Sequence, residues 1–177
     1  MKKRITLVAC FDSKSIDVIN NSLQHINKTQ LCKVPYHIEN RIYNDTLPFH
    51  ITLSAWDIDK KDIILEKLPS ICFNKIKLEV VFDIIENSDK SLLLYLKPVN
   101  QLQLRHLQRL AYDILPTNRY NPEKYLLHST INISDNINQI REQLSSLSNI
   151  KLELVIDKIC LFEIYPAKLI TTQSFKK

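Results

Sequence analysis

Residues 49–56 read Phe-His-Ile-Thr-Leu-Ser-Ala-Trp and place a histidine two positions before a threonine within an apolar run. Short apolar runs that alternate with polar residues are typical of half-buried β-strands. Side chains two residues apart on a strand share a face, and the rise is about 3.3 Å per residue, so we expect His50 and Thr52 roughly 6.6 Å apart on one face. Together they can contact one small anion.

The same pattern recurs at residues 126–133, which read Leu-Leu-His-Ser-Thr-Ile-Asn-Ile. His128 precedes Thr130 as His50 precedes Thr52, and an apolar residue follows each threonine. With five histidines in the chain, two such matches are a coincidence of roughly one in forty. The repeat predicts two equivalent strands that bring two imidazoles and two hydroxyls to one site.

Composition describes an ordinary globular chain of 177 residues, with 45% hydrophobic and 24% charged residues. No apolar run approaches the ~20 residues that span a bilayer. The basic N-terminus leads into a short apolar run without a small-residue cleavage site, which favours a first strand over a signal peptide. We therefore expect a cytoplasmic, monomeric protein that does not bind membranes. The net charge of +5 is compatible with a polyanionic partner.

Glycine is absent from the chain, which excludes the Gly-rich loops that cradle phosphates in nucleotide-triphosphate and dinucleotide sites. The four cysteines are scattered and have no metal-ligand spacing with a histidine. They are Cys10, Cys32, Cys72 and Cys160. We expect reduced thiols, no metal site and no cofactor.

Hydrophobic periodicity and capping residues predict the elements of the first half. These are a strand at 4–11, a helix from Asp12 or Ser13 through Ile26, the first histidine strand at 49–56, and a helix from Asp57 or Asp59 through Leu68. Residues 27–48 are polar and stay unassigned. The two halves of a hairpin follow at 75–85 and 91–97.

The second half continues in the same manner. The expected elements are a helix at 101–114 begun by Asn100 and ended by Pro116, the second histidine strand at 126–133, a helix from Ser134 or Asp135 through Leu147, strands at 151–156 and 158–165, and a frayed tail from Thr171. The halves share the order helix, loop, histidine strand, helix and β-rich sequence. This order predicts an α+β fold in which residues 1–177 form one bilobal domain. Two similar lobes would face each other across a central cleft, with antiparallel sheets inside and helices outside.

Paired His-x-Thr-apolar motifs, one in each half and preceded by an N-terminal strand and helix, resemble the 2H phosphoesterase superfamily. That group includes the bacterial RNA 2′,3′-cyclic phosphodiesterases, also called 2′-5′ RNA ligases. The resemblance implies a bilobal fold and a metal-free site formed by His50, Thr52, His128 and Thr130. It also implies that the substrate is an RNA 3′ end or a nucleotide with a cyclic or 2′-5′ phosphodiester.

Two features depart from the family pattern. Ser129 stands where the family favours an apolar residue, so we expect the second strand to be less buried on its back face. Many members carry an arginine shortly after the second motif, but residues 132–134 here are Asn-Ile-Ser. Arg119 and Lys124, in the preceding loop, are the candidates for positive charge, with a solvated loop cation as the simpler interpretation.

The residues themselves are suited to phosphodiester hydrolysis, because imidazoles exchange protons near neutral pH and hydroxyls donate to phosphate oxygens. By analogy with the family, His50 is the acid and His128 the base. A single histidine would be interpreted as structural, but the pair favours catalysis. The alternative is a non-catalytic RNA- or nucleotide-binding module with the same cleft. Four aromatic residues are candidates for base stacking, although core packing is favoured for each: Trp56, Tyr43, Tyr120 and Tyr125.

Overall fold

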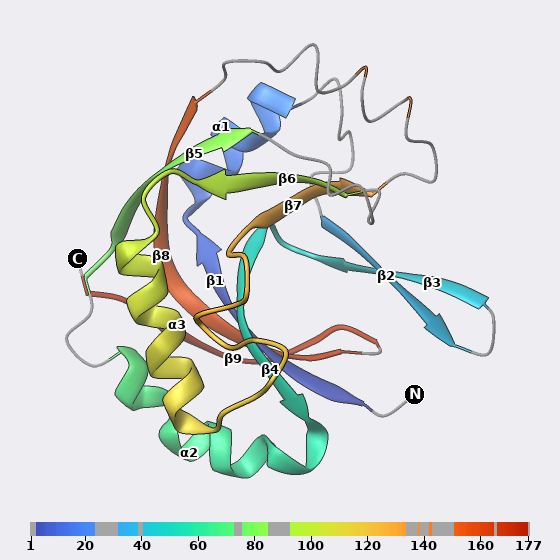
Figure 1. Cartoon of the computed structure of the whole chain (residues 1–177), viewed down its shortest axis with the longest axis vertical. Helices are drawn as coiled ribbons and strands as arrows, with labels where there is room; N and C mark the ends of the chain where they lie inside the picture. Colours follow the sequence, from blue (N-terminus) through green and yellow to red (C-terminus); the bar gives the residue numbers. More distant parts are fainter. Residues whose placement is uncertain are drawn as a thin grey trace.

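The computed structural model of the chain describes residues 3–23, 32–38, 41–72, 76–84, 93–133, 151–164 and 166–176, together with Asn138 and Glu142. It has the expected α+β fold (Figure 1). The described elements, in chain order, are β1 (Arg4–Phe11), α1 (Ser13–Leu23), β2 (Cys32–Ile38), β3 (Arg41–Leu47), β4 (His50–Asp57), the 3₁₀ turn η1 (Ile58–Lys60), α2 (Lys61–Cys72), β5 (Leu78–Ile84), β6 (Leu93–Pro98), α3 (Leu102–Ile114), β7 (Ser129–Ile133), β8 (Lys151–Ile164) and β9 (Lys168–Ser174).

One seven-stranded antiparallel sheet contains both histidine motifs. Its strand order is β4-β1-β8-β5-β6-β7, and β9 also pairs with β8. Although β4 and β7 lie at opposite ends of this order, their Cα atoms approach within 8 Å of each other. The sheet therefore curves until its two ends meet, as Figure 1 shows near the centre of the molecule. The division into two similar lobes around a cleft stays a prediction.

The long strand β8 connects the two halves of the sheet. Its first part pairs with β5, and its later part pairs with β1 and β9. The expectation of two strands, at 151–156 and 158–165, divided at Asp157 was wrong. The β1–β8 register shifts there, so a β-bulge absorbs Asp157 without ending the strand.

The expectation of a frayed C-terminal tail was also wrong. Residues Lys168–Ser174 form β9, which pairs with β8. The backbone N–H of Phe175 then donates to the carbonyl of Asp157 at 2.8 Å, and Phe175 is only 6% exposed. Burial of this ring, together with strand pairing, orders the tail.

The predicted helices are confirmed where the structure describes them. Asp12, rather than Ser13, caps α1, because its Oδ1 accepts the Ser15 N–H at 2.8 Å. Asn100 Oδ1 likewise accepts the Leu102 N–H at 3.0 Å at the start of α3. Asp57 precedes η1, but its side chain makes no cap hydrogen bond. Of the helix expected from 134 to 147, Asn138 and Glu142 are helical, and the rest lies outside the described residues.

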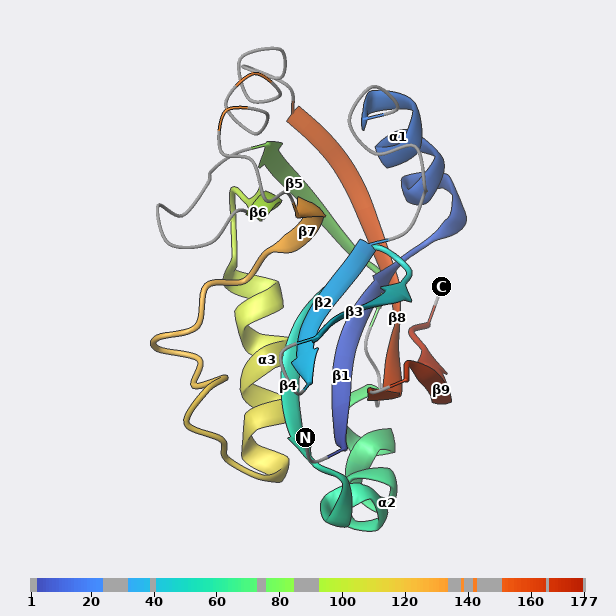
Figure 2. The same cartoon turned by 90° about the vertical axis from the view of Figure 1, so that its right-hand side faces the viewer.

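Pairing accounts for the remaining segments. The unassigned region contains the β2–β3 hairpin, and the predicted β5–β6 hairpin is confirmed, with its loop outside the described residues. Figure 2 shows α2 and α3 at one end of the sheet and α1 near the other end. Among the described helices, none has both the length and the apolar character to cross a membrane.

The two faces of β1 pack into different clusters, which decides where the histidine motif lies. Alternate residues from Ile5 to Phe11 belong to the main core, whereas Val8 and Cys10 belong to a smaller cluster with Phe162. In the β1–β4 register, Cys10 lies opposite His50 and Val8 lies opposite Thr52. The register then shifts, because Leu7 lies opposite Ser54 and not Leu53. Leu53 is therefore the additional residue of a bulge on β4, and it is fully buried. The motif therefore faces away from the main core.

Removal of the Phe175 ring tests the ordered tail. Because the ring is buried, we expect Phe175→Ala to lower the free energy of unfolding by about 3–5 kcal/mol in urea denaturation. Leu169→Ala on β9, the strand just before Phe175, is the matched control, since that side chain is 51% exposed and its removal should cost no more than about 0.5 kcal/mol. Equal effects of the two substitutions would contradict an ordered tail.

Candidate functional site

His50 is the first residue of β4, and its imidazole is held by the chain just before it. Its Nδ1 lies 2.7 Å from the carbonyl oxygen of Pro48. A carbonyl oxygen only accepts, so Nδ1 carries the proton and donates it to this bond. In the neutral ring, Nε2 is then the nitrogen with a free lone pair. The side chain is buried, which limits the positions that the ring can adopt.

His128 repeats this arrangement in the second half of the chain. It immediately precedes β7, so the second histidine strand begins one residue later than the motif. Its Nδ1 lies 2.8 Å from the carbonyl oxygen of Leu126, again two residues upstream. The same reasoning gives Nδ1 the proton and leaves Nε2 with the free lone pair. Each histidine motif forms one half of the candidate site, and in both halves Nε2 is the imidazole nitrogen with the free lone pair.

The fold brings the two half-sites together. β4 carries Thr52 and β7 carries Thr130, and these strands are in contact. Positive charge on His128 also lowers the pKa of His50, so the imidazoles lie within electrostatic range of one another. The four residues predicted from the sequence therefore lie on two adjoining strands or, for His128, directly before one of them.

Burial lowers the pKa of both imidazoles below the ordinary value of 6.5. For His50, burial is the largest cause, the hydrogen bond to Pro48 opposes it, and the charge of His128 adds to it. For His128, burial is again the largest cause and the bond to Leu126 opposes it. Burial therefore favours the neutral form of both rings.

The back face of the second strand corrects one expectation. Ser129 is completely buried and lies opposite Leu96 of β6. A small polar residue was expected to make this face less buried. The neighbouring Leu127 and Ile131 are themselves fully buried in the main core, and they enclose the serine.

Two tyrosines flank His128, and sequence reasoning did not assign them to the site. The ring centroid of Tyr95 lies 5.1 Å from that of His128, and the Tyr125 ring lies 6.0 Å away. Tyr95 is opposite Thr130 in the β6–β7 register. The signal for Tyr95 was a single polar ring in an otherwise leucine-rich strand. Tyr125 had been considered only for base stacking or core packing.

Tyr125 also contacts the first half-site. A hydrogen bond with the Thr52 side chain lowers the pKa of its phenol, while its ring lies beside His128. Burial is the main cause of a raised pKa for this phenol, so the hydroxyl keeps its proton. A phenol and a threonine hydroxyl can each donate or accept, so either group can be the donor in this bond. Tyr125 thus joins the two motifs.

Arg105 on α3 holds the loop that carries Tyr125. Its Nη1 donates to the carbonyl oxygens of Pro122 at 2.7 Å and Tyr125 at 2.8 Å. The same guanidinium donates to the side-chain oxygens of Gln101 and Gln108, each at 2.7 Å. Charged donors make stronger hydrogen bonds than neutral ones, so this group fixes the loop against the helix.

The structure gives most of the other residues considered from the sequence different surroundings. Trp56 is buried in the main core, as packing predicted, and its Nε1 donates to the Leu115 carbonyl at 2.7 Å. The Arg119 guanidinium lies 5.6 Å from the centre of the Tyr120 ring, whose centroid is in turn 4.8 Å from that of Tyr125. Lys124 is exposed, and the side chain of Tyr43 lies outside the described residues.

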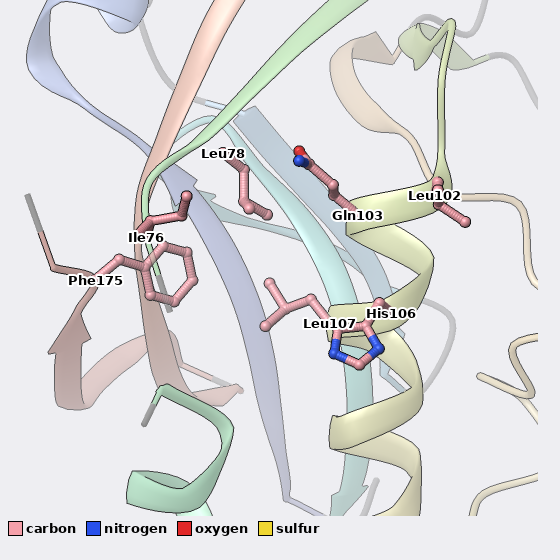
Figure 3. Close-up of a pocket in the computed structure, with 7 residues that line it drawn as sticks. All are labelled: Ile76, Leu78, Leu102, Gln103, His106, Leu107 and Phe175. Atoms are coloured by element: carbon pink, nitrogen blue, oxygen red, sulfur yellow. The ribbon is translucent and has the colours of Figure 1, made fainter. Parts of the chain in front are cut away.

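A separate hollow of about 510 Å³ lies between α3 and the beginning of β5. In Figure 3, Phe175, Ile76 and Leu78 line one side and Leu107 lies across from them on α3. His106 lines this hollow, whereas His50 and His128 do not. Its walls are mainly apolar, so it is not the candidate site. Within the described ranges, no cluster of three or more His, Cys, Asp or Glu side chains could hold a metal ion.

Comparison with solved structures shows which known proteins share this fold. No protein-family model matches the sequence, and no curated protein matches it. The chain has the fold of solved LigT-type phosphoesterase structures. Escherichia coli LigT in complex with 3′-AMP aligns with a TM-score of 0.60 at 10% identity and covers 99% of each chain. TT0787 of Thermus thermophilus aligns with a TM-score of 0.57 at 10% identity and covers 97% of each chain.

These neighbours agree with the resemblance recognised from the sequence. A crystal structure described as a phosphoesterase aligns with a TM-score of 0.57 at 10% identity, over 99% of both chains. At such low identity the likeness concerns the fold, and the roles of individual residues must be argued from this chain.

The lowered imidazole pKa values predict how stability depends on pH. Just below pH 6.5 the unfolded chain binds more protons than the folded chain, so the free energy of unfolding falls as the pH drops through this window. The slope is at most about 1.4 kcal/mol per pH unit for each imidazole. Urea denaturation of the double variant His50→Gln/His128→Gln should show a flatter dependence between about pH 5 and 7 than the parent. An unchanged slope would contradict the lowered pKa values.

Proposed function

We propose that this protein is a metal-independent phosphodiesterase for 2′,3′-cyclic phosphates or 2′-5′-linked RNA or nucleotides. The observation that carries the proposal is the duplicated imidazole geometry, in which each Nδ1 donates to a carbonyl two residues upstream and each Nε2 is left for chemistry. The shared fold with LigT supports it, since LigT has been crystallised with 3′-AMP, ATP and NADP⁺. We also propose a cytoplasmic monomer.

In the proposed reaction, water attacks phosphorus while Nε2 of His128 takes its proton. The bond from phosphorus to the departing ribose oxygen breaks, and Nε2 of His50 protonates that oxygen. The negative charge of a bound phosphodiester raises the pKa of His50 and offsets the effect of burial. The hydroxyls of Thr52 and Thr130 donate to the non-bridging oxygens as charge develops there. The reaction therefore consumes one water molecule, and the two histidines carry out its two proton transfers.

Replacement of either imidazole tests the proposal. We expect His50→Ala and His128→Ala each to lower kcat at least ~100-fold with a 2′,3′-cyclic nucleotide, because each removes one proton-transfer group. The wild-type rate should follow a bell-shaped pH profile and survive EDTA. His106→Ala, in the separate hollow, is the matched control and should retain the parent rate. Near-normal turnover by both site variants would exclude this mechanism.

The hydrogen bond between Tyr125 and Thr52 predicts a non-additive pair of substitutions. Loss of one hydrogen bond costs about 0.5–1.5 kcal/mol, so Tyr125→Phe should lower kcat roughly two- to tenfold. If the phenol acts through Thr52, adding Tyr125→Phe to Thr52→Ala should have little further effect. Tyr112→Phe on α3 controls for loss of a phenol. Additive effects would show that the Tyr125 hydroxyl acts independently of Thr52.

A non-catalytic RNA- or nucleotide-binding module is the second candidate. It is favoured by the burial of both imidazoles, which lowers their pKa values and so disfavours the protonated form that a general acid needs. The same assays separate the two functions. Binding of 2′,3′-cyclic nucleotide and of 2′-5′-linked oligoadenylate without turnover of either would support the module.

A further inference from the structure

Two cysteines that the proposed reaction does not use lie together on the central strands. In the β1–β8 register, Val8 is opposite Cys160 and Cys10 is opposite Lys158. Cys10 and Cys160 are therefore diagonal neighbours on one face of the sheet, and each thiol shifts the pKa of the other. The residues are 2% and 5% exposed, respectively.

Cys160 is surrounded by groups that stabilise a thiolate. Its Sγ lies 3.5 Å from Thr172 Oγ1 on β9, and Lys158 projects on the same face two residues earlier. The Cys10 thiol lies diagonally across from it on β1. Together these groups lower the pKa of Cys160 despite its burial, whereas the pKa of Cys10 is raised, mainly by its hydrogen bond with Cys160. Asp157 opposes the effect at Cys160, but its carboxylate lies 3.4 Å from Lys158 Nζ.

A hollow of about 640 Å³ gives small molecules a route to this pair. Cys10, Cys160, Lys158 and Thr172 all line it, and so does Pro48. A peroxide is little larger than water, so this volume admits it. The hollow adjoins the candidate site, because Pro48 provides the acceptor for His50 and Cys10 lies opposite His50 in the register.

We propose that Cys160 is a peroxide-reactive thiol, with Thr172 Oγ1 in contact with its sulfur and Lys158 and Cys10 beside it on the same face of the sheet. The Cys160 sulfur attacks one oxygen of the peroxide, the O–O bond breaks, and the products are a cysteine sulfenic acid and hydroxide. Sulfur loses two electrons and the peroxide gains them. No metal or cofactor takes part in the step.

The strand register also predicts where oxidation stops. Diagonal neighbours on an antiparallel pair have Cα atoms about 7–8 Å apart, whereas a disulfide requires less than about 7 Å. A disulfide between Cys10 and Cys160 would therefore require backbone movement in the two central strands. We accordingly assign the sulfenic acid, and not the disulfide, as the product.

Labelling of the folded protein tests this assignment without reference to hydrolysis. A Cys32→Ser background leaves the three described thiols, and treatment with hydrogen peroxide and dimedone traps sulfenic acids for peptide mass mapping. We expect the adduct on Cys160 before Cys72, although Cys72 is the more exposed residue. Cys160→Ser should abolish that adduct. Thr172→Val, which is close to isosteric, should slow its formation roughly two- to tenfold through loss of one hydrogen bond.

Three results would overturn the inference. They are labelling of Cys72 ahead of Cys160, an unchanged rate in Thr172→Val, and a Cys10–Cys160 disulfide detected as the main product. Iodoacetamide alkylation of the same variants gives a second measure of thiolate character. Selective alkylation of Cys160 supports the inference, and equal alkylation of Cys72 and Cys160 contradicts it. None of these measurements depends on the proposed hydrolase activity.

Discussion

The pairing of β8 with strands from both halves of the sheet is the constraint on which the rest of the structure depends. Its first part pairs with β5 and its later part with β1 and β9, so a single strand fixes the relation between the two histidine strands. Because β4 and β7 lie at opposite ends of the strand order, they meet only through the curvature of the whole sheet. The bulge at Asp157 lets β8 continue through a polar pair without losing its partners.

The two histidines of the candidate site are held by the same local hydrogen-bond arrangement. Each imidazole hydrogen bonds through Nδ1 to a carbonyl two residues upstream, so its tautomer is set by its own segment of chain. What differs is the surroundings. His50 is buried at the start of its strand, whereas His128 lies against two tyrosine rings. Tyr125 then connects the halves through Thr52, and Arg105 restrains the loop that carries it.

The face of the sheet that carries His50 also carries Cys10 and Cys160, because the register of β1 with β4 and β8 aligns them. The His50 imidazole and a pair of thiols thus share one face of the sheet, and Pro48 borders both. The scattered cysteines showed no relation to one another in the sequence. Their proximity arises from the antiparallel pairing of the first strand with a strand near the C-terminus.

Local pattern was enough to predict β1, α1, α3, the β5–β6 hairpin and the α+β class, because periodicity and capping act over a few residues. It also identified His50, Thr52, His128 and Thr130 as a repeated pair, and their chemical roles remain predictions. The tail was misjudged because Phe175 is ordered by a core whose other members are distant in the sequence.

By itself, the sequence determined which residue types recur at strand spacing and which elements form. Only the tertiary structure decided that the two motifs lie on adjoining edge strands, that Tyr95 and Tyr125 flank His128, and that Cys10 meets Cys160. The physical reason is that these contacts depend on register and sheet curvature, which arise from pairing between segments far apart in the chain.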